Sequence, residues 1–204
     1  MKRPPIGVLA VFLAVVCAAC IPFAGGKKLN TEQKEDLERA ASLEPIEAFK
    51  RDVEPAIIRA RNEVMTRENY RSYDGNDYIS QLSVGDQTLY RMISRSYDFD
   101  EHDPQRVQEA FDGELKPFGF DLRRDTYAAD GGSTDTVLVW TSERYGVTVD
   151  IMVSQSWLTS LNYYTGYLRS DGTSANPQEL ADIPGRVPEW FRSEEHTSEL
   201  QSHY

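Results

Sequence analysis

The chain of 204 residues has only two thiols, Cys17 and Cys20, and both lie near its start. They end an apolar run, where the small residues Ala18 and Ala19 precede Cys20. A thiol in that position can accept a diacylglyceryl group and become the acylated first residue once the preceding segment is cleaved. Two acyl chains hold a protein stably at a bilayer, whereas one holds it only marginally. Cys20 is therefore the candidate lipidation residue, and the lipid bilayer is the partner that it implies.

The segment before Cys20 has the order of a secretory signal. Met1–Arg3 is positively charged, and Ile6–Ala19 is apolar but shorter than the ~20 residues that span a bilayer core. The pattern resembles the bacterial lipobox, from which it departs at Cys17, where Leu or Val is usual. We predict a signal peptide over residues 1–19, a lipid-anchored tether over 20–30, and a location on the extracytoplasmic face of the cell membrane. Cleavage near Ala19 by ordinary signal peptidase, which would give a freely secreted protein, is the alternative.

The other end of the chain has an unusual origin. Arg192–Ser202 reads RSEEHTSELQS, which is residue for residue the translation of a common short-read sequencing adapter, and His203 fits its next base. We interpret residues 192–204 as adapter-derived and expect the native chain to continue differently after Phe191. His102 is then the only native histidine, which disfavours zinc sites that need two.

The charge balance restricts the partners. The formal net charge is −11, and it is unchanged without the signal segment and the tail, because each sign loses three charges. An acidic domain repels nucleic acid, so we expect no nucleic-acid partner. After Cys20 the chain has no further cysteine, which leaves no disulfide and no thiolate metal site. We expect no metal and no cofactor.

Residues 31–191 are expected to form a single α+β domain. Its first part, 31–66, is predicted to be helical, with Thr31 as N-cap and a kink or break at Pro55. One apolar stripe at helical spacing consists of Ile46, Phe49, Val53, Ile57, Ala60 and Val64.

Residues 67–119 form a mixed region in this prediction. Asp74–Asp77 is a turn cluster, 78–84 a short strand and 86–97 a helix with Leu89, Met92 and Ile93 on its apolar face. The next helix begins clearly, with Asp103 as N-cap and Pro104 in its first turn, and ends at Pro117 and Gly119.

From 120 to 168 the apolar period changes to two, which is typical of strands. We expect an antiparallel meander of three to four strands with the preceding helix packed on it, and an irregular end over 169–191. The predicted core comprises Val137, Val139, Val149, Ile151 and Val153, with Trp140 partly buried.

Two segments offer candidate binding chemistry. Trp157, Tyr163, Tyr164 and Tyr167 lie close in sequence, and aromatic rings can stack on sugar faces; packing within the sheet is the alternative explanation. Asp98–Asp103 is rich in carboxylates but lacks the glycine and the terminal glutamate of a calcium loop, so a polar loop and helix cap is the favoured interpretation.

The last part of the chain resembles a known group. Leu115–Phe120, Gly131–Gly132, Trp140, Tyr145–Val149 and Tyr163–Tyr167 are laid out as in small uncharacterised lipoproteins of actinobacteria, of the mycobacterial LppA-like and Actinomyces type. The resemblance implies a lipobox, an N-terminal helix and a C-terminal helix followed by a β-meander. It implies no activity and no catalytic residues.

These observations favour a membrane-anchored cell-envelope lipoprotein that is not an enzyme and that binds an envelope protein or a glycan, or supports the cell surface. An envelope hydrolase is the first alternative. It would need His102 as general base or a pair of carboxylates, and the chain has no Gly-x-Ser-x-Gly element. A small-ligand or glycan binder is the second. We identify no catalytic residues.

Overall fold

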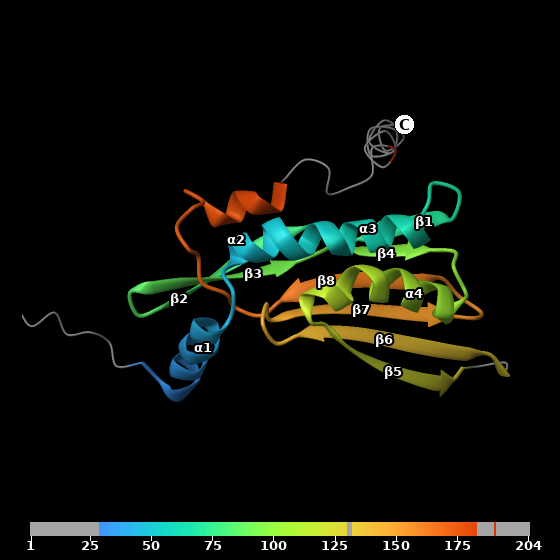
Figure 1. The fold of residues 1–204 in the computed structure, drawn as a ribbon, viewed down its shortest axis with the longest axis horizontal. Coiled ribbons are helices and arrows are strands. Elements are labelled where there is room, and N and C mark those ends of the chain that lie inside the picture. Colours follow the sequence, from blue (N-terminus) through green and yellow to red (C-terminus); the bar gives the residue numbers. More distant parts are fainter. Residues whose placement is uncertain (1–28, 130–131, 183–189, 191–204) are drawn as a thin grey trace, which may run out of the picture.

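The computed structural model describes residues 29–129, 132–182 and 190, and these form an α+β structure built on one antiparallel sheet of eight strands (Figure 1). The α+β prediction is confirmed, but the predicted sheet of three to four strands is too small. The signal segment, Cys20 and the adapter-like tail lie outside the described residues.

The helical part agrees with its prediction except at its start. It consists of α1 (Thr31–Ser42), α2 (Ile46–Ala48), the π-helical turn η1 (Phe49–Val53) and α3 (Glu54–Val64). Asn30, not Thr31, caps α1, because its side chain accepts from the backbone N–H of Gln33 at 2.8 Å and the Gln33 side chain caps it in return. Pro55 stands in the first turn of α3, directly after the wider π turn, as the predicted break requires.

The mixed region holds four strands: β1 (Tyr70–Asp74), β2 (Tyr78–Val84), β3 (Gln87–Ile93) and β4 (Ser96–Phe99). The strand predicted over 78–84 is confirmed, whereas the helix predicted over 86–97 is wrong. Gly85 adopts a φ of 64° and closes a tight hairpin, so β3 pairs with β2 along its whole length. Leu89 and Met92 are both buried because opposite faces of the hairpin are covered.

The second half follows the expected order. It contains α4 (Pro104–Leu115), capped by Asp103, then the 3-10 turn η2 (Lys116–Phe118) and the strands β5 (Asp121–Ala128), β6 (Thr134–Ser142), β7 (Val147–Ser154) and β8 (Thr159–Thr165). The short 3-10 turn η4 (Pro177–Asp182) lies in the region expected to be irregular. The predicted α4 and the meander of four strands are confirmed.

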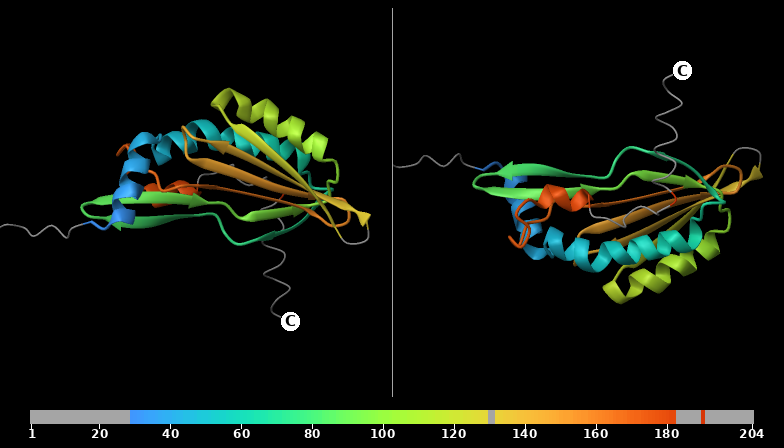
Figure 2. Two further views of the ribbon diagram at one scale, coloured as in Figure 1. Left: turned by 90° about the horizontal axis from the view of Figure 1, so that it is seen from below. Right: turned by 90° about the horizontal axis from the view of Figure 1, so that it is seen from above.

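The sheet joins both halves, in the order β1-β4-β8-β7-β6-β5, with β3 also pairing with β8 and β2 with β3. Helices α3 and α4 lie on one face, and among the described helices only α1 meets the opposite face, at the end beside the β2–β3 hairpin (Figure 2). We call this opposite side the open face. Trp140 points to the helices and is 1 % exposed, where its Nε1 donates to Asp112 at 3.0 Å.

One core prediction in β6 is corrected by this geometry. Leu138 and Trp140 face the helices, so Val137 and Val139 point to the open face, where Val139 is buried as predicted but Val137 is only partly buried. In β7 the predicted core residues Val149, Ile151 and Val153 are buried.

Candidate functional site

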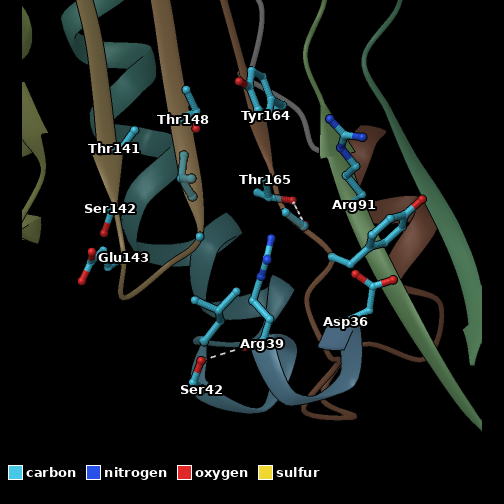
Figure 3. Close-up of a pocket in the computed structure, with 15 residues that line it drawn as sticks. Asp36, Arg39, Ser42, Arg91, Thr141, Ser142, Glu143, Thr148, Tyr164 and Thr165 are labelled. Atoms are coloured by element: carbon cyan, nitrogen blue, oxygen red, sulfur yellow. Dashed lines mark hydrogen bonds between the residues drawn. The ribbon is translucent and has the colours of Figure 1, made fainter. Parts of the chain in front are cut away.

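A cavity of about 580 Å³ lies where the open face meets helix α1 (Figure 3). Its walls are the last turns of α1, the β6–β7 hairpin, the end of β8 and the side of β3. The lining residues are Asp36, Arg39, Ser42, Leu43, Arg91, Thr141, Ser142, Glu143, Gly146, Val147, Thr148, Tyr164, Thr165, Gly166 and Tyr167. We call this cavity the α1 pocket.

The floor of the α1 pocket follows from strand register. Thr141 of β6 pairs with Thr148 of β7, which pairs with Tyr164 of β8, so the three side chains stand side by side on the open face. Thr165 follows at the strand end, where its hydroxyl accepts from the Met92 N–H at 3.0 Å and donates to the Gly166 carbonyl at 2.8 Å. The bond from Met92 ties β3 to β8 at this edge of the floor.

The outer wall is helix α1, and the segment that follows it is attached at several points. The Glu44 N–H donates to the Arg144 carbonyl at 3.0 Å, and the Ile46 N–H donates to the Arg169 carbonyl at 3.0 Å. Arg169 also donates to the carbonyl of Ala41 at 2.8 Å. Gly146, at a φ of 60°, brings the hairpin turn against Leu43. These contacts hold α1 at the end of the sheet.

Two guanidinium groups face this space. Arg39 reaches up from α1 toward Thr165, and Arg91 enters from β3 beside Tyr164 (Figure 3). The Arg91 guanidinium carbon lies 5.6 Å from the centre of the Tyr164 ring, a cation–π contact. Its Nε is buried and has no hydrogen-bond partner in the described part of the chain.

Two carboxylates complete the polar lining. Asp36 and Glu143 lie on opposite sides of Arg39 in Figure 3, and neither forms an ion pair with it among the residues that the structure describes. The α1 pocket therefore carries two groups of each charge that remain separate from one another. Hydroxyl groups of Ser42, Thr141, Thr148 and Thr165 also line the α1 pocket.

The structure separates the four aromatic residues that were predicted to bind a ligand. Tyr164 and Tyr167 line the α1 pocket. Tyr163 points to the helices, is 1 % exposed and donates through its hydroxyl to Glu54 at 2.9 Å. Trp157 is 78 % exposed and lies in the β7–β8 loop, at the opposite end of these strands from the α1 pocket. The four residues therefore form no single surface.

Arg39 and Arg91 were not predicted from the sequence as residues of a binding site. Arg39 lies in a charge-rich helix and Arg91 in a segment predicted to be helical, so neither position indicated a cavity. A signal existed in Thr88–Ile93, where alternation places Arg91 between apolar neighbours. The candidate lipidation residue Cys20 lies outside the described residues.

His102, the only histidine among the described residues, serves a structural contact. His102 Nδ1 lies 2.7 Å from the Ser154 carbonyl oxygen, and Nε2 lies 2.6 Å from Asp100 Oδ1. The bond to the Ser154 carbonyl, followed by that to Asp100, raises the pKa of His102. Both ring nitrogens are thus engaged without a serine hydroxyl, which is not the arrangement of a Ser-His nucleophile.

The acidic side chains of the described residues are not grouped as a metal site. Among residues 29–129, 132–182 and 190, no group of three or more His, Cys, Asp or Glu side chains is arranged to hold a metal ion. The carboxylate-rich segment 98–103 forms the end of β4 and the cap of α4. A buried ion pair joins Lys50 to Glu54 beneath α2, beside a second, smaller cavity of about 360 Å³.

The open face also carries a carboxylate without an ion pair. Asp150 stands in the centre of β7 between Val139 and Asn162, and no ion pair to it is found within the described ranges. Burial raises the pKa of Asp150, and the nearby Arg123 opposes that rise only in part. No helix in the described part of the chain is long and apolar enough to cross a membrane.

Comparison with known proteins assigns the chain to a protein family. Residues 42–176 match the sequence model of a family described as a domain of unknown function (DUF4853). The crystal structure of a DUF4853 family protein from Actinomyces odontolyticus is similar, with 17 % identity and a TM-score of 0.49; the match covers 71 % of this chain and 84 % of that one. No curated protein matches the chain.

Proposed function

Since the chain belongs to the DUF4853 family, whose description names no activity, we propose its function from the α1 pocket. The protein acts as a membrane-anchored cell-envelope lipoprotein whose folded domain binds a small ligand and does not turn it over. The family assignment agrees with the resemblance to uncharacterised actinobacterial proteins, and the anchor is the acylated Cys20 at the extracytoplasmic face.

The α1 pocket is the observation that supports this proposal. Small-ligand sites are typically cavities of about 300–1,000 Å³ with a few convergent polar groups. The α1 pocket has about 580 Å³, two tyrosines, several hydroxyls and charged groups contributed by separate elements. The pocket lies against α1, the first described helix after the predicted tether, so a protein anchored at Cys20 would hold its ligand close to the bilayer.

Binding without turnover is favoured by the arrangement of nucleophiles and bases. No histidine of the described residues lies beside the hydroxyls of the α1 pocket, because His102 lies at the other end of β7, bonded to Ser154. General-base work near neutral pH usually falls to histidine. The carboxylates Asp36 and Glu143 are contributed by α1 and by the β6–β7 hairpin.

Two experiments test the proposal. Metabolic labelling with a palmitate analogue should mark the protein, and Cys20→Ser should abolish the label and release the protein from the membrane fraction. Label that persists on the variant would contradict the anchor. A digest of purified cell envelope should give saturation-transfer NMR signals from bound fragments. These signals should be lost in Tyr164→Ala. The composition of the digest should stay constant over hours with the unaltered protein, because the ligand is bound and not turned over.

A further inference from the structure

The arginines of the α1 pocket differ from most other arginines of the described chain. Seven form ion pairs with carboxylates: Arg51, Arg59, Arg71, Arg95, Arg106, Arg123 and Arg144. Arg61, Arg124 and Arg169 donate to hydroxyl, amide or carbonyl oxygens. Arg39 and Arg91 have neither kind of contact among the described residues, and both line the same cavity.

This arrangement is costly for the free protein at Arg91, whose buried Nε has no hydrogen-bond partner in the described part of the chain. Burying a donor without an acceptor carries a desolvation cost, whereas Arg39 is exposed and reaches solvent. The chain is acidic, with a net charge of −11, so carboxylates to pair with these arginines are abundant. Asp36 and Glu143 line the same cavity yet pair with neither arginine. The two guanidiniums are thus left available for an acceptor from outside the chain.

From this geometry we infer that the α1 pocket binds an anionic saccharide, a sugar ring that carries a carboxylate or phosphate group. The inference rests on the proposed function and specifies its ligand. The anionic group lies between Arg39 and Arg91, where charge-assisted hydrogen bonds form. The ring packs on the exposed side of Tyr164, and its hydroxyls donate to Asp36 and Glu143.

The mixed charge of the α1 pocket argues for this class over a simple anion. A bare phosphate satisfies the arginines but leaves Asp36 and Glu143 without donors and repels them. A neutral sugar satisfies the carboxylates and hydroxyls but leaves both guanidiniums without an acceptor. A ligand with one anionic group and several hydroxyls complements all four charged side chains.

The test uses the full chain in non-ionic detergent and four soluble probes in calorimetric titrations. Glucuronate and glucose 6-phosphate are anionic sugars, glucose is the neutral control, and glycerol phosphate presents the anion of a lipid headgroup without a sugar ring. We expect the anionic sugars to bind at least about tenfold more tightly than either control, since a hydrogen bond to a charged group contributes roughly a factor of ten or more.

Variants then assign the contacts. Arg39→Gln and Arg91→Gln should each weaken anionic-sugar binding at least about tenfold and leave the weak binding of glucose unchanged. Arg59→Gln is the matched control, because Arg59 pairs with Glu114 on the helical face. Circular dichroism and the melting temperature show that each variant is folded.

The outcomes separate the inference from the proposed function. Equal binding of glucose and glucuronate, with loss of both in Tyr164→Ala, would overturn the anionic specificity while the binding function stands. Glycerol phosphate binding as tightly as glucose 6-phosphate would overturn the saccharide and identify a lipid headgroup. Anionic-sugar binding that survives both arginine substitutions would place the site elsewhere.

Discussion

Tyr163 and Tyr164 are adjacent in β8 and have opposite environments. Side chains alternate across a strand, so one ring must face the helices and the other the open face. Tyr163 is buried and donates to Glu54, which is itself 3 % exposed and paired with Lys50. Tyr164 lies beside Arg91 in the α1 pocket. Of this pair, only Tyr164 is placed to contact a ligand.

Asp150 gives a prediction of pH dependence at the residue scale. Its folded-state pKa is raised by burial, so the folded protein holds the proton more tightly than the unfolded chain does. Its ionised form therefore costs stability at pH above the folded-state pKa, and that cost disappears as the pH falls below the unfolded-state value. Asp150→Asn should raise the melting temperature at pH 7 and have little effect near pH 3.

The control for this prediction is Asp121→Asn, which removes an exposed carboxylate from the same open face in β5. The melting temperatures of both variants and of the unaltered protein are measured by thermal unfolding over pH 3–8. A melting temperature that falls at pH 7 in Asp150→Asn would show that the ionised carboxylate has a stabilising partner.

At the scale of elements, the attachment of α1 depends on the β6–β7 turn. Gly146 has a φ of 60°, and a Cβ placed there would lie 2.7 Å from Leu43 Cδ1. The left-handed conformation costs a residue with a Cβ roughly 1–2 kcal/mol, and the displaced Leu43 adds to this. Gly146→Ala should therefore destabilise the fold by roughly 2–3 kcal/mol in denaturant unfolding.

Gly172→Ala is the matched control, since Gly172 has a φ of 80° and nothing lies within 4 Å of the added Cβ. Its cost measures the backbone conformation alone, and the difference between the two variants measures the contact with Leu43. Equal destabilisation would mean that Leu43 moves aside freely and that the α1 wall is not sensitive to this turn.

At the scale of the whole molecule, two apolar clusters have different sizes. The main cluster joins α2, α3 and α4 to the sheet, whereas the second holds only Ala40, Val84 and Leu89 between α1 and the β2–β3 hairpin. Leu29, Leu37, Leu82 and Tyr167 are packed at its margin. Helix α1 is thus a small addition to a core that is complete without it, and all of it except its last residue, Ser42, lies before the start of the family match.

A chain that starts at Leu43 tests this division. It should still unfold cooperatively, because the main cluster is intact, and lose roughly 2 kcal/mol of stability from the exposed second cluster. That loss corresponds to a melting temperature lower by roughly 4–8 °C. It should also lose ligand binding, since Arg39 is removed. Non-cooperative unfolding in circular dichroism would show that α1 belongs to the main core.

The sequence by itself determined the elements whose signals are local. Asp103 and Pro104 predicted the start of α4, Pro55 predicted the break before α3, and alternation predicted the strands of the meander, because caps, proline and period depend only on near neighbours. The charge pattern and Cys20 likewise gave the envelope hypothesis without any structure.

Only the tertiary structure decided what depends on distant partners. The spacing of Leu89, Met92 and Ile93 fits a helix, but pairing with β2 and cover on both faces make this segment a strand. The register of β5–β8 selects which face of β6 is core, a choice that alternation alone leaves open. Arg39 and Arg91 are far apart in the sequence and line one cavity because α1 packs at the end of the sheet, and no local pattern records this proximity.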